Sequence, residues 1–377
     1  MNDWIKLSLP HKSGNEMKYV EEAYRDDWFV PLGPNVNEFE RRLEKYIGEQ
    51  RPVVALSAGT AAIHLGLVML GVKQGDEVLC QSLTFSASAN PICYQGATPV
   101  FVDSEPSTYN ISPEYLVEAI ESRKKATGRL PKAIVAVELY GMPARWDEIL
   151  EIANHYGIPV LEDSAEAMGS EYKSQKCGSL GQYGVLSFNG NKIITTSGGG
   201  ALICPDAESA ARVKFLATQA REDRPYYYHN VIGYNYRLSN ISAGIGCGQI
   251  EDINERVNRR REIHHLYAEG LDGVGGLAVQ DNPGKEFNSN FWLTTIRIPN
   301  DASLSPDQLR LKLLDQKIET RLLWRPMHMQ PVFSSAAYYG SNVGETLFDQ
   351  GLCLPSGSSL TDDQIARVID AIKSALQ

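Results

Sequence analysis

Features of a disulfide-bonded or zinc-binding protein are missing from this sequence. Its six cysteines are scattered, and none belongs to a Cys-x-x-Cys pair. Several lie inside apolar runs, which is typical of buried free thiols, so neither disulfides nor a zinc site are expected. His264 and His265 are neighbours on a predicted helix and cannot share one face as metal ligands would.

Long hydrophobic runs and a surplus of positive charge are also lacking. No run of about 18 apolar residues occurs, and no basic and apolar signal segment is visible at the start. Lysine and arginine number 36 against 46 acidic residues, which gives a net charge of −10 and a pI of about 5.3. Because nucleic-acid and membrane-surface binding need positive surface, we expect a cytoplasmic protein that binds neither.

Two common nucleotide-binding signatures are absent. The sequence has no Gly-x-x-x-x-Gly-Lys-Ser/Thr motif. The glycines at 244, 246 and 248 follow no strand-like run and lack the spacing of a dinucleotide-binding loop. Nucleotide hydrolysis and dinucleotide binding therefore lose their main sequence support.

What the sequence does have is the rhythm of a parallel α/β protein. With 377 residues, 43% of them hydrophobic, the chain is long enough for two domains. Short apolar runs alternate with helical segments, including predicted helices at 113–121 and 145–156, and this alternation predicts a mainly parallel sheet covered by helices. The expected strands are 53–56, 77–80, 99–102, 133–137, 160–162, 185–188 and 201–204.

The pattern changes near residue 250. One long charged helix is expected over 250–271, followed by a strand at 291–298 and helices at 305–316 and 361–376. These elements suit a smaller α/β domain. We therefore predict a large domain of residues 14–250 and a small domain of residues 251–377, joined by the N-terminal segment 1–13.

One lysine stands between an apolar run and a triple glycine. Lys192 lies in the segment 185–200, and an apolar run at 158–161 leads to the carboxylate of Asp163. A lysine can form a Schiff base with pyridoxal phosphate, and a carboxylate can keep the pyridine nitrogen of that cofactor protonated. Taken singly, Lys192 could equally be a solvated lysine and Asp163 a helix cap.

A third element favours the cofactor. Residues 53–67 read as a strand, a turn and a helix, and the N–H groups at such a helix start bind phosphate well. Ser57 and Thr60 offer hydroxyls there, and Gly59 allows the backbone to come close. Ser187 ends a later strand and could also bind phosphate. Small polar residues cap ordinary helices too, but the order of the three elements is a rare coincidence.

Three further residues have both a functional and a structural interpretation. Phe85 is predicted at the carboxyl edge of the sheet, where it could stack on a ligand or belong to the core. Glu166 could reach the cofactor or substrate, or only be a favourable charge in the first turn of a helix. His328 could carry protons, although a single histidine between two prolines is more often structural.

These motifs together resemble the DegT/DnrJ/EryC1/StrS family of sugar-nucleotide aminotransferases over nearly the whole chain. The resemblance implies the fold-type I, aspartate aminotransferase-like α/β architecture. The motifs that carry it are Pro31-Leu32-Gly33-Pro34 with Phe39-Glu40, Ser57-Ala58-Gly59-Thr60-Ala61-Ala62, Glu162-Asp163-Ser164-Ala165-Glu166, Ser187-Phe188-Asn189-Gly190-Asn191-Lys192, Tyr234-Asn235-Tyr236-Arg237-Leu238-Ser239 and Pro326-Met327-His328-Met329-Gln330.

The resemblance also implies roles for residues of this chain. Lys192 would be the Schiff-base lysine and Asp163 the partner of the pyridine nitrogen of pyridoxal 5'-phosphate. Asn235 would reach the cofactor phosphate of the other subunit, so a homodimer with shared active sites is expected. The remaining implied cofactor contacts are Ala58, Gly59, Thr60, Phe85, Glu166 and Ser187.

Within the family, the form of residues 189–200 is similar to the branch that makes UDP-N-acetylbacillosamine precursors. This likeness implies transfer of an amino group from L-glutamate to C4 of a UDP-linked 4-keto-6-deoxy-N-acetylhexosamine, for surface polysaccharide or glycan synthesis. Glu166 and the run Gly198–Gly200 depart from the wider family pattern and agree with this branch. Ser164 replaces an expected alanine.

An acidic protein needs a local group of cations and donors to bind a nucleotide diphosphate. We expect that group among Arg237, Arg325 and His328, with Trp324 beside it and Asn191 also contacting substrate. Alternatives are a TDP-, GDP- or 3-keto-sugar substrate, or a non-catalytic regulatory protein on the same fold. A sugar dehydratase of this fold is disfavoured, because the resemblance implies a histidine there in place of Lys192.

Overall fold

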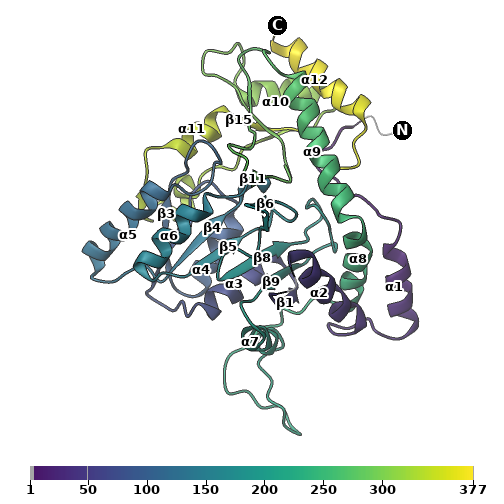
Figure 1. Ribbon diagram of the computed structural model, residues 1–377, viewed down its shortest axis with the longest axis vertical. Helices are drawn as coiled ribbons and strands as arrows, with labels where there is room; N and C mark the ends of the chain where they lie inside the picture. Colours follow the sequence, from purple (N-terminus) through teal and green to yellow (C-terminus); the bar gives the residue numbers. More distant parts are fainter. Residues whose placement is uncertain (1–3, 49, 377) are drawn as a thin grey trace.

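An eight-stranded sheet forms the centre of the molecule (Figure 1). The computed structural model describes residues 4–48 and 50–376. All neighbouring strands of this sheet run parallel except β9, which is antiparallel to both of its neighbours. The strand order is β1 (Val53–Leu56), β9 (Gly200–Ile203), β8 (Tyr183–Ser187), β5 (Val160–Asp163), β4 (Ala133–Val137), β2 (Glu77–Gln81), β3 (Thr98–Val102) and β14 (Tyr338–Tyr339).

Helices cover both faces of this sheet, which explains why its strands are apolar at nearly every position. Alternate residues of one strand face opposite layers: Cys80 faces the layer that contains α3 (Gly59–Met69), α4 (Asn90–Tyr94) and α7 (Ala207–Ala217). Leu79 faces the other side, where α5 (Pro113–Thr127) and α6 (Trp146–Tyr156) lie. The sheet is therefore the middle layer of the core, and each of its faces is packed against a layer of helices.

The C-terminal part of the chain has its own sheet and core. Its strands run in the order β10 (Ala278–Val279), β12 (Thr295–Arg297), β15 (Gly351–Cys353) and β13 (Arg321–Leu322). A cluster of aliphatic side chains buries this sheet against three helices. The helices of this part are α9 (Ile253–Gly270), α10 (Pro306–Asp315), α11 (Val343–Gln350) and α12 (Asp362–Leu376). A third sheet joins β11 (Phe287–Asn288) of the C-terminal part to two earlier strands, in the order β11, β6 (Glu171–Tyr172) and β7 (Gln175–Lys176).

The helix expected over 250–271 is wrong in its extent, because two helices meet there. α8 (Asn240–Glu251) ends and α9 begins around Asp252, whose backbone leaves helical geometry. α8 is rich in glycine and packs tightly on α1 (Glu16–Arg25) and α2 (Pro34–Ile47). A Cβ at Gly246 would lie 2.7 Å from the Phe39 ring, and one at Gly248 would lie 2.6 Å from the Glu16 backbone nitrogen. Close packing therefore explains glycines that reduce helix propensity.

Two other expectations change in the C-terminal part. The strand expected at 291–298 is limited to β12, because Phe291 has a left-handed φ of 48° and the preceding residues are held by side-chain hydrogen bonds. The large sheet also gains β14 from far along the chain, which pairs in parallel with β3. The seven strands expected before residue 205 are confirmed to within two residues at each end.

Among residues 4–48 and 50–376, no helix combines the length and the apolar character that crossing a bilayer requires.

Candidate active site

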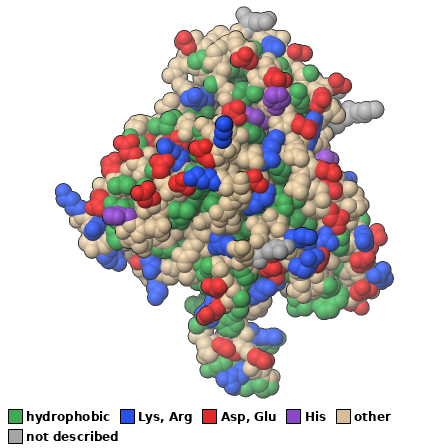
Figure 2. Space-filling view, in the orientation of Figure 1, with side chains coloured by type: hydrophobic (Ala, Val, Ile, Leu, Met, Phe, Trp, Pro, Cys, Tyr) green, Lys and Arg blue, Asp and Glu red, His purple; other side chains and the backbone are tan. Residues whose placement is uncertain are grey.

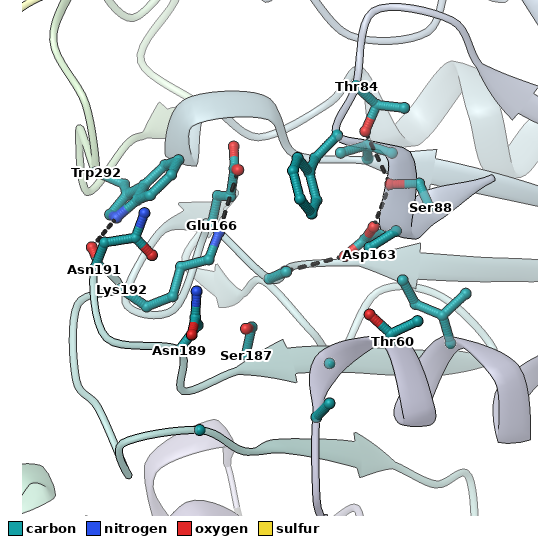
Figure 3. A pocket seen from close by; sticks show the side chains of 18 of the residues that line it. Thr60, Thr84, Ser88, Asp163, Glu166, Ser187, Asn189, Asn191, Lys192 and Trp292 are labelled. Carbon is teal, nitrogen blue, oxygen red and sulfur yellow. Dashed lines mark hydrogen bonds and ion pairs between the residues drawn. The ribbon is translucent and has the colours of Figure 1, made fainter. Parts of the chain in front are cut away.

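A cavity of about 440 Å³ opens where β5 and β8 end and α3 begins (Figure 3). This is the edge at which open α/β sheets bind ligands. Register explains the convergence, because Leu56, Gly200 and Ser187 lie opposite one another on three adjacent strands. The turn that leads from β1 into α3 therefore stands directly beside the end of β8.

The start of α3 supplies donors for a phosphate. Ala58 is the N-cap, with extended backbone and no side-chain cap bond, so the first N–H groups of the helix are left for a ligand. The side chains of Thr60 and Ser187 line the same part of the cavity. A Cβ on Gly200 would lie 2.4 Å from the Gly59 nitrogen, so this glycine lets the turn approach the sheet.

A buried carboxylate lies at another part of the cavity. Asp163 ends β5 and is only 4% exposed. Its Oδ2 accepts a hydrogen bond of 2.6 Å from the Ser88 hydroxyl, and its Oδ1 accepts one of 3.2 Å from the Ala165 N–H. Burial raises the pKa of Asp163, while these donors and the charge of Lys192 oppose that rise. A positively charged group beside Asp163 would complete its environment.

Lys192 reaches into the cavity from the loop after β8. Its Nζ lies 3.2 Å from Glu166 Oε1 and 3.9 Å from the centroid of the Trp292 ring, and its side chain is mostly buried. Glu166 also accepts a hydrogen bond of 2.8 Å from the Tyr140 N–H. Burial raises the pKa of Glu166, and the charge of Lys192 lowers it. Residues 164–170 form turns, so Glu166 is not in the first turn of a helix.

Aromatic rings form a wall of the same cavity. Phe85 is 52% exposed, although it is a large apolar side chain beside a buried sheet edge. Its ring centroid lies 5.5 Å from that of Trp324, whose backbone N–H donates to the Tyr140 hydroxyl at 2.8 Å. An exposed ring at this position is available to stack on a flat ligand.

The structure brings most of the predicted site residues to this one cavity. Two residues that the sequence did not indicate, Trp292 and Arg321, also line it. Both come from the C-terminal part of the chain, so only tertiary contacts could have revealed them. The predicted residues in the lining are Ala58, Gly59, Thr60, Phe85, Asp163, Glu166, Ser187, Asn191, Lys192 and Trp324.

Three of the predicted substrate-binding residues lie outside this lining. Arg237 is an ion-pair partner of Glu40 at 2.8 Å and also donates to the Ala55 carbonyl at 3.1 Å. His328 bonds the Ser82 hydroxyl at 2.7 Å and Glu345 at 3.1 Å, as a structural histidine would. Arg325 is exposed on the surface.

Asn235 is also away from Lys192. It lines a second cavity, of about 370 Å³, together with Pro31, Leu32 and Arg237. Within one chain, Asn235 is therefore not part of the cavity that holds Lys192.

The geometry agrees with comparisons against known proteins. The sequence pattern of the DegT/DnrJ/EryC1/StrS aminotransferase family matches residues 10–373. The chain belongs to this family. As a sugar aminotransferase, it has the fold-type I architecture that the sequence predicts.

Its similarity to individual members extends over whole chains. It is 48% identical to EpsN of Bacillus subtilis, to which a pyridoxal phosphate-dependent aminotransferase activity is attributed, over 99% of this chain and 96% of EpsN. It is 37% identical to the GDP-perosamine synthase of Caulobacter vibrioides, over 99% and 98% of the two chains. A crystal structure of a family aminotransferase from Brucella abortus superposes with a TM-score of 0.90 at 29% identity, covering 96% of this chain and 95% of the other.

The cofactor of this aminotransferase is pyridoxal 5'-phosphate. The cavity fits that group at each of its functional parts. Donors at the start of α3 suit the phosphate, the buried Asp163 suits a protonated ring nitrogen, and Phe85 offers a flat surface to the ring. Among the residues that the structure describes, Lys192 is the one lysine in the lining of the cavity, and its amine is of the kind that forms a Schiff base.

Proposed function

We propose that the enzyme moves an amino group from L-glutamate to C4 of a UDP-linked 4-keto-6-deoxy-N-acetylhexosamine. The products would be 2-oxoglutarate and the UDP-4-amino sugar. The main observation behind the amino transfer is that Lys192, Asp163 and the start of α3 meet in one cavity. The form of residues 189–200, similar to the UDP-N-acetylbacillosamine branch, supports the choice of sugar.

Different residues of the cavity would hold the cofactor and carry the proton. When bound, pyridoxal phosphate supplies an electron sink for breaking the C–H bond of the amino donor. Asp163 would keep the ring nitrogen protonated, and Ser187, Thr60 and the α3 N–H groups would hold the phosphate. Lys192 Nζ would take the proton from the donor carbon and return it later, acting as a general base and then as a general acid.

Arg321 is a further candidate for binding the acidic substrates. It lines the cavity beside Lys192 and Trp324, whereas Arg237 is already paired with the buried Glu40. The guanidinium of Arg321 lies 3.7 Å from Glu319, and its side chain is 48% exposed, so it can still meet a carboxylate or a diphosphate. Binding of the nucleotide diphosphate by Arg325 and His328 remains a proposal that rests on the sequence pattern alone.

A GDP-linked keto sugar is the second candidate substrate. This alternative is favoured by the 37% identity to a protein named GDP-perosamine synthase. Base identity is read far from the reacting carbon, so the cofactor cavity itself does not distinguish the two nucleotides.

We also propose a homodimer in which each active site uses residues of both subunits. The segment 221–233 extends away from the body below α7 (Figure 1), and several of its large apolar side chains are exposed, among them Tyr227 at 80% and Ile232 at 85%. A second exposed apolar run lies at 28–32. Exposed apolar surface of this kind marks a contact with another chain. Asn235, which lines the cavity beside Leu32, would then contact the cofactor phosphate of the partner subunit.

A panel of nucleotide-linked keto sugars tests the substrate. Purified enzyme is incubated with glutamate and, separately, UDP-, TDP- and GDP-linked 4-keto and 3-keto sugars, and the products are measured by mass spectrometry. We expect amination of the UDP-linked 4-keto-N-acetylhexosamine with the largest kcat/KM. Faster amination of a GDP-linked sugar would replace the UDP proposal and leave the amino-transfer chemistry intact.

A further inference from the structure

Trp292 contacts both Lys192 and the residue before it, Asn191 (Figure 3). The Lys192 ammonium lies over the indole face, 3.9 Å from the ring centroid. The indole N–H donates a hydrogen bond of 2.7 Å to the carbonyl of Asn191, the residue directly before the lysine. The same ring therefore touches the reacting end of the side chain and fixes the backbone from which that side chain extends.

The ring itself is held firmly. Trp292 is only 1% exposed, and its backbone N–H donates to Asn290 Oδ1 at 2.7 Å. Its carbonyl accepts from the buried guanidinium of Arg260, which also donates to the Ser8 hydroxyl at 3.0 Å. Ser8 in turn donates to the Asn191 carbonyl at 2.9 Å. These bonds form a closed network around the lysine loop, so the indole has little freedom to turn.

Two electron-rich groups face Lys192 Nζ. Glu166 contributes a carboxylate at 3.2 Å and Trp292 contributes the negative face of its π system. Both interactions are strong because the site is largely removed from water. A neutral amine would gain from neither to the same extent.

We propose that Trp292 is a catalytic residue that stabilises Lys192 as an ammonium whenever the lysine is free of the cofactor and carries a proton. This inference rests on the proposed role of Lys192 as the proton carrier. Each transfer brings a proton from the donor carbon to Nζ and later returns it to the cofactor, so the ammonium must form and be held within reach between the two steps. The indole face and Glu166 provide that holding position.

The reactivity of free Lys192 tests this directly and needs no amino-transfer activity. The cofactor-free full chain is labelled with trace acetic anhydride, and mass spectrometry compares acetylation of Lys192 with that of the exposed Lys125 in the same sample. Only the neutral amine reacts. In Trp292→Leu the Lys192/Lys125 ratio should rise about twofold to thirtyfold near pH 8, the range that corresponds to loss of an exposed to a desolvated cation–π contact.

Two controls separate charge from access and packing. Near pH 11, where free lysines are largely neutral, the ratio should rise by a much smaller factor than near pH 8, whereas a simple opening of the cavity would raise it by the same factor at both pH values. In Trp324→Leu, which removes another tryptophan of the cavity wall, the ratio near pH 8 should stay at the wild-type value. Site-specific 5,7-difluorotryptophan at position 292 keeps the shape and the N–H but weakens the π face, so it should raise the ratio even if Trp292→Leu does not fold.

The kinetic measurement adds the link to catalysis. With the holoenzyme and glutamate alone, the fluorinated enzyme should show a lower kcat, a nearly unchanged KM and a larger isotope effect with 2-deuterated glutamate, because proton transfer becomes slower. An unchanged acetylation ratio in a folded fluorinated protein would overturn the proposal for Trp292. If the ratio rises but no keto sugar is aminated, the proposed function fails while the ammonium site stands.

Discussion

At the scale of single residues, the charged side chains of the cavity leave room for one more positive charge. Asp163 and Glu166 are both buried and acidic, and Lys192 is the one lysine that lines the cavity with them. Lys192 Nζ is directly paired with Glu166, while Asp163 has only neutral donors in its hydrogen bonds. On the proposed role of Asp163, the protonated ring nitrogen of pyridoxal phosphate would supply the second positive charge of the site.

The glycines beside Lys192 differ in what they allow. A Cβ on Gly200 would lie 2.4 Å from the Gly59 nitrogen, whereas a Cβ on Gly198 would have nothing within 4 Å. We expect Gly200→Ala to displace the start of α3 and weaken binding of pyridoxal phosphate at least about tenfold. Gly198→Ala is the matched control and should bind within about twofold of wild type. Equilibrium titration of cofactor absorbance measures both constants, and equal affinities in the two variants would contradict this account of the phosphate site.

Residues at the ends of strands could be predicted from the sequence, and residues placed by distant contacts could not. Asp163 and Lys192 follow apolar runs that were predicted to be buried strands, and parallel strands bring such ends to one edge. Arg237 has the right chemistry for an anion, but its partner Glu40 comes from a helix almost 200 residues earlier in the chain. Trp292 and Arg321 stand in no recognisable motif, because only the packing of the C-terminal part brings them to the cavity.

At the level of elements, a buried acidic pair lies where β4 and β5 end: Glu138 directly follows β4, and Glu162 is the last residue but one of β5. Glu138 and Glu162 are fully buried, and their carboxylate oxygens lie within 4.8 Å of each other and of the Cys177 thiol. Glu162 accepts hydrogen bonds from the N–H groups of residues 178, 180 and 181 and from the Ser164 hydroxyl. These donors suit an ionised Glu162. Burial and the neighbouring charge of Glu162 hold the pKa of Glu138 well above its usual range, so the pair keeps one proton.

This pair predicts a specific pH dependence of stability. Because the pKa of Glu138 is higher in the folded than in the unfolded chain, its contribution is fully present below the unfolded value and is lost as pH rises through the folded value. Glu138→Gln replaces the neutral acid by a neutral amide. Relative to this variant, the wild type should lose about 1.4 kcal/mol of unfolding free energy per pH unit from roughly pH 4.3 up to the raised folded pKa of Glu138, and no more above that pKa.

Urea denaturation of the cofactor-free chain at several pH values between about 5 and 9 measures this difference. Cys177→Ser, which changes a neighbour that is not one of the two carboxyls, should run parallel to the wild type. A constant offset between Glu138→Gln and the wild type over the whole range would mean that the pair holds no extra proton.

Short buried strands could be predicted from the sequence, whereas a helix whose glycines are needed for close packing could not. The strands before residue 205 are short apolar runs bounded by turn residues, and each is found within two residues of its expected ends. No element was predicted for the segment of α8, which is rich in glycine, and the structure shows that these glycines serve close packing on α1 and α2. The capping box at Ser305 and Gln308 fixed the start of α10 as expected.

At the scale of the whole molecule, the net negative charge does not form one continuous acidic patch on the face that Figure 2 shows. On the face in Figure 2, acidic and basic side chains are interspersed, and the projecting segment carries both signs together with apolar groups. Attraction of an anionic sugar nucleotide must then come from local groups rather than from net charge. The exposed apolar segments at 28–32 and 221–233 are the parts of the surface best suited to a second chain.

Hybrid dimers test whether active sites are shared. Lys192→Ala and Asn235→Ala chains are each expected to have little activity alone. If Asn235 serves the site of the other subunit, a mixed dimer contains one site with both residues intact, and a refolded equimolar mixture should recover about a quarter of wild-type activity. Size-exclusion chromatography with light scattering checks the dimer. No recovery above the sum of the separate variants, in a mixture shown to contain hybrids, would contradict shared sites.

The most direct test of the central claim is a single-turnover experiment in two steps. Glutamate alone, added to the purified enzyme carrying pyridoxal phosphate, should remove the visible absorbance of the lysine-bound cofactor and release about one 2-oxoglutarate per subunit. Adding the UDP-linked 4-keto sugar should then restore the absorbance and yield an equal amount of amino sugar, and Lys192→Ala should do neither. Amino sugar formed at the wild-type rate by Lys192→Ala, or no 2-oxoglutarate from the wild-type enzyme, would contradict the account.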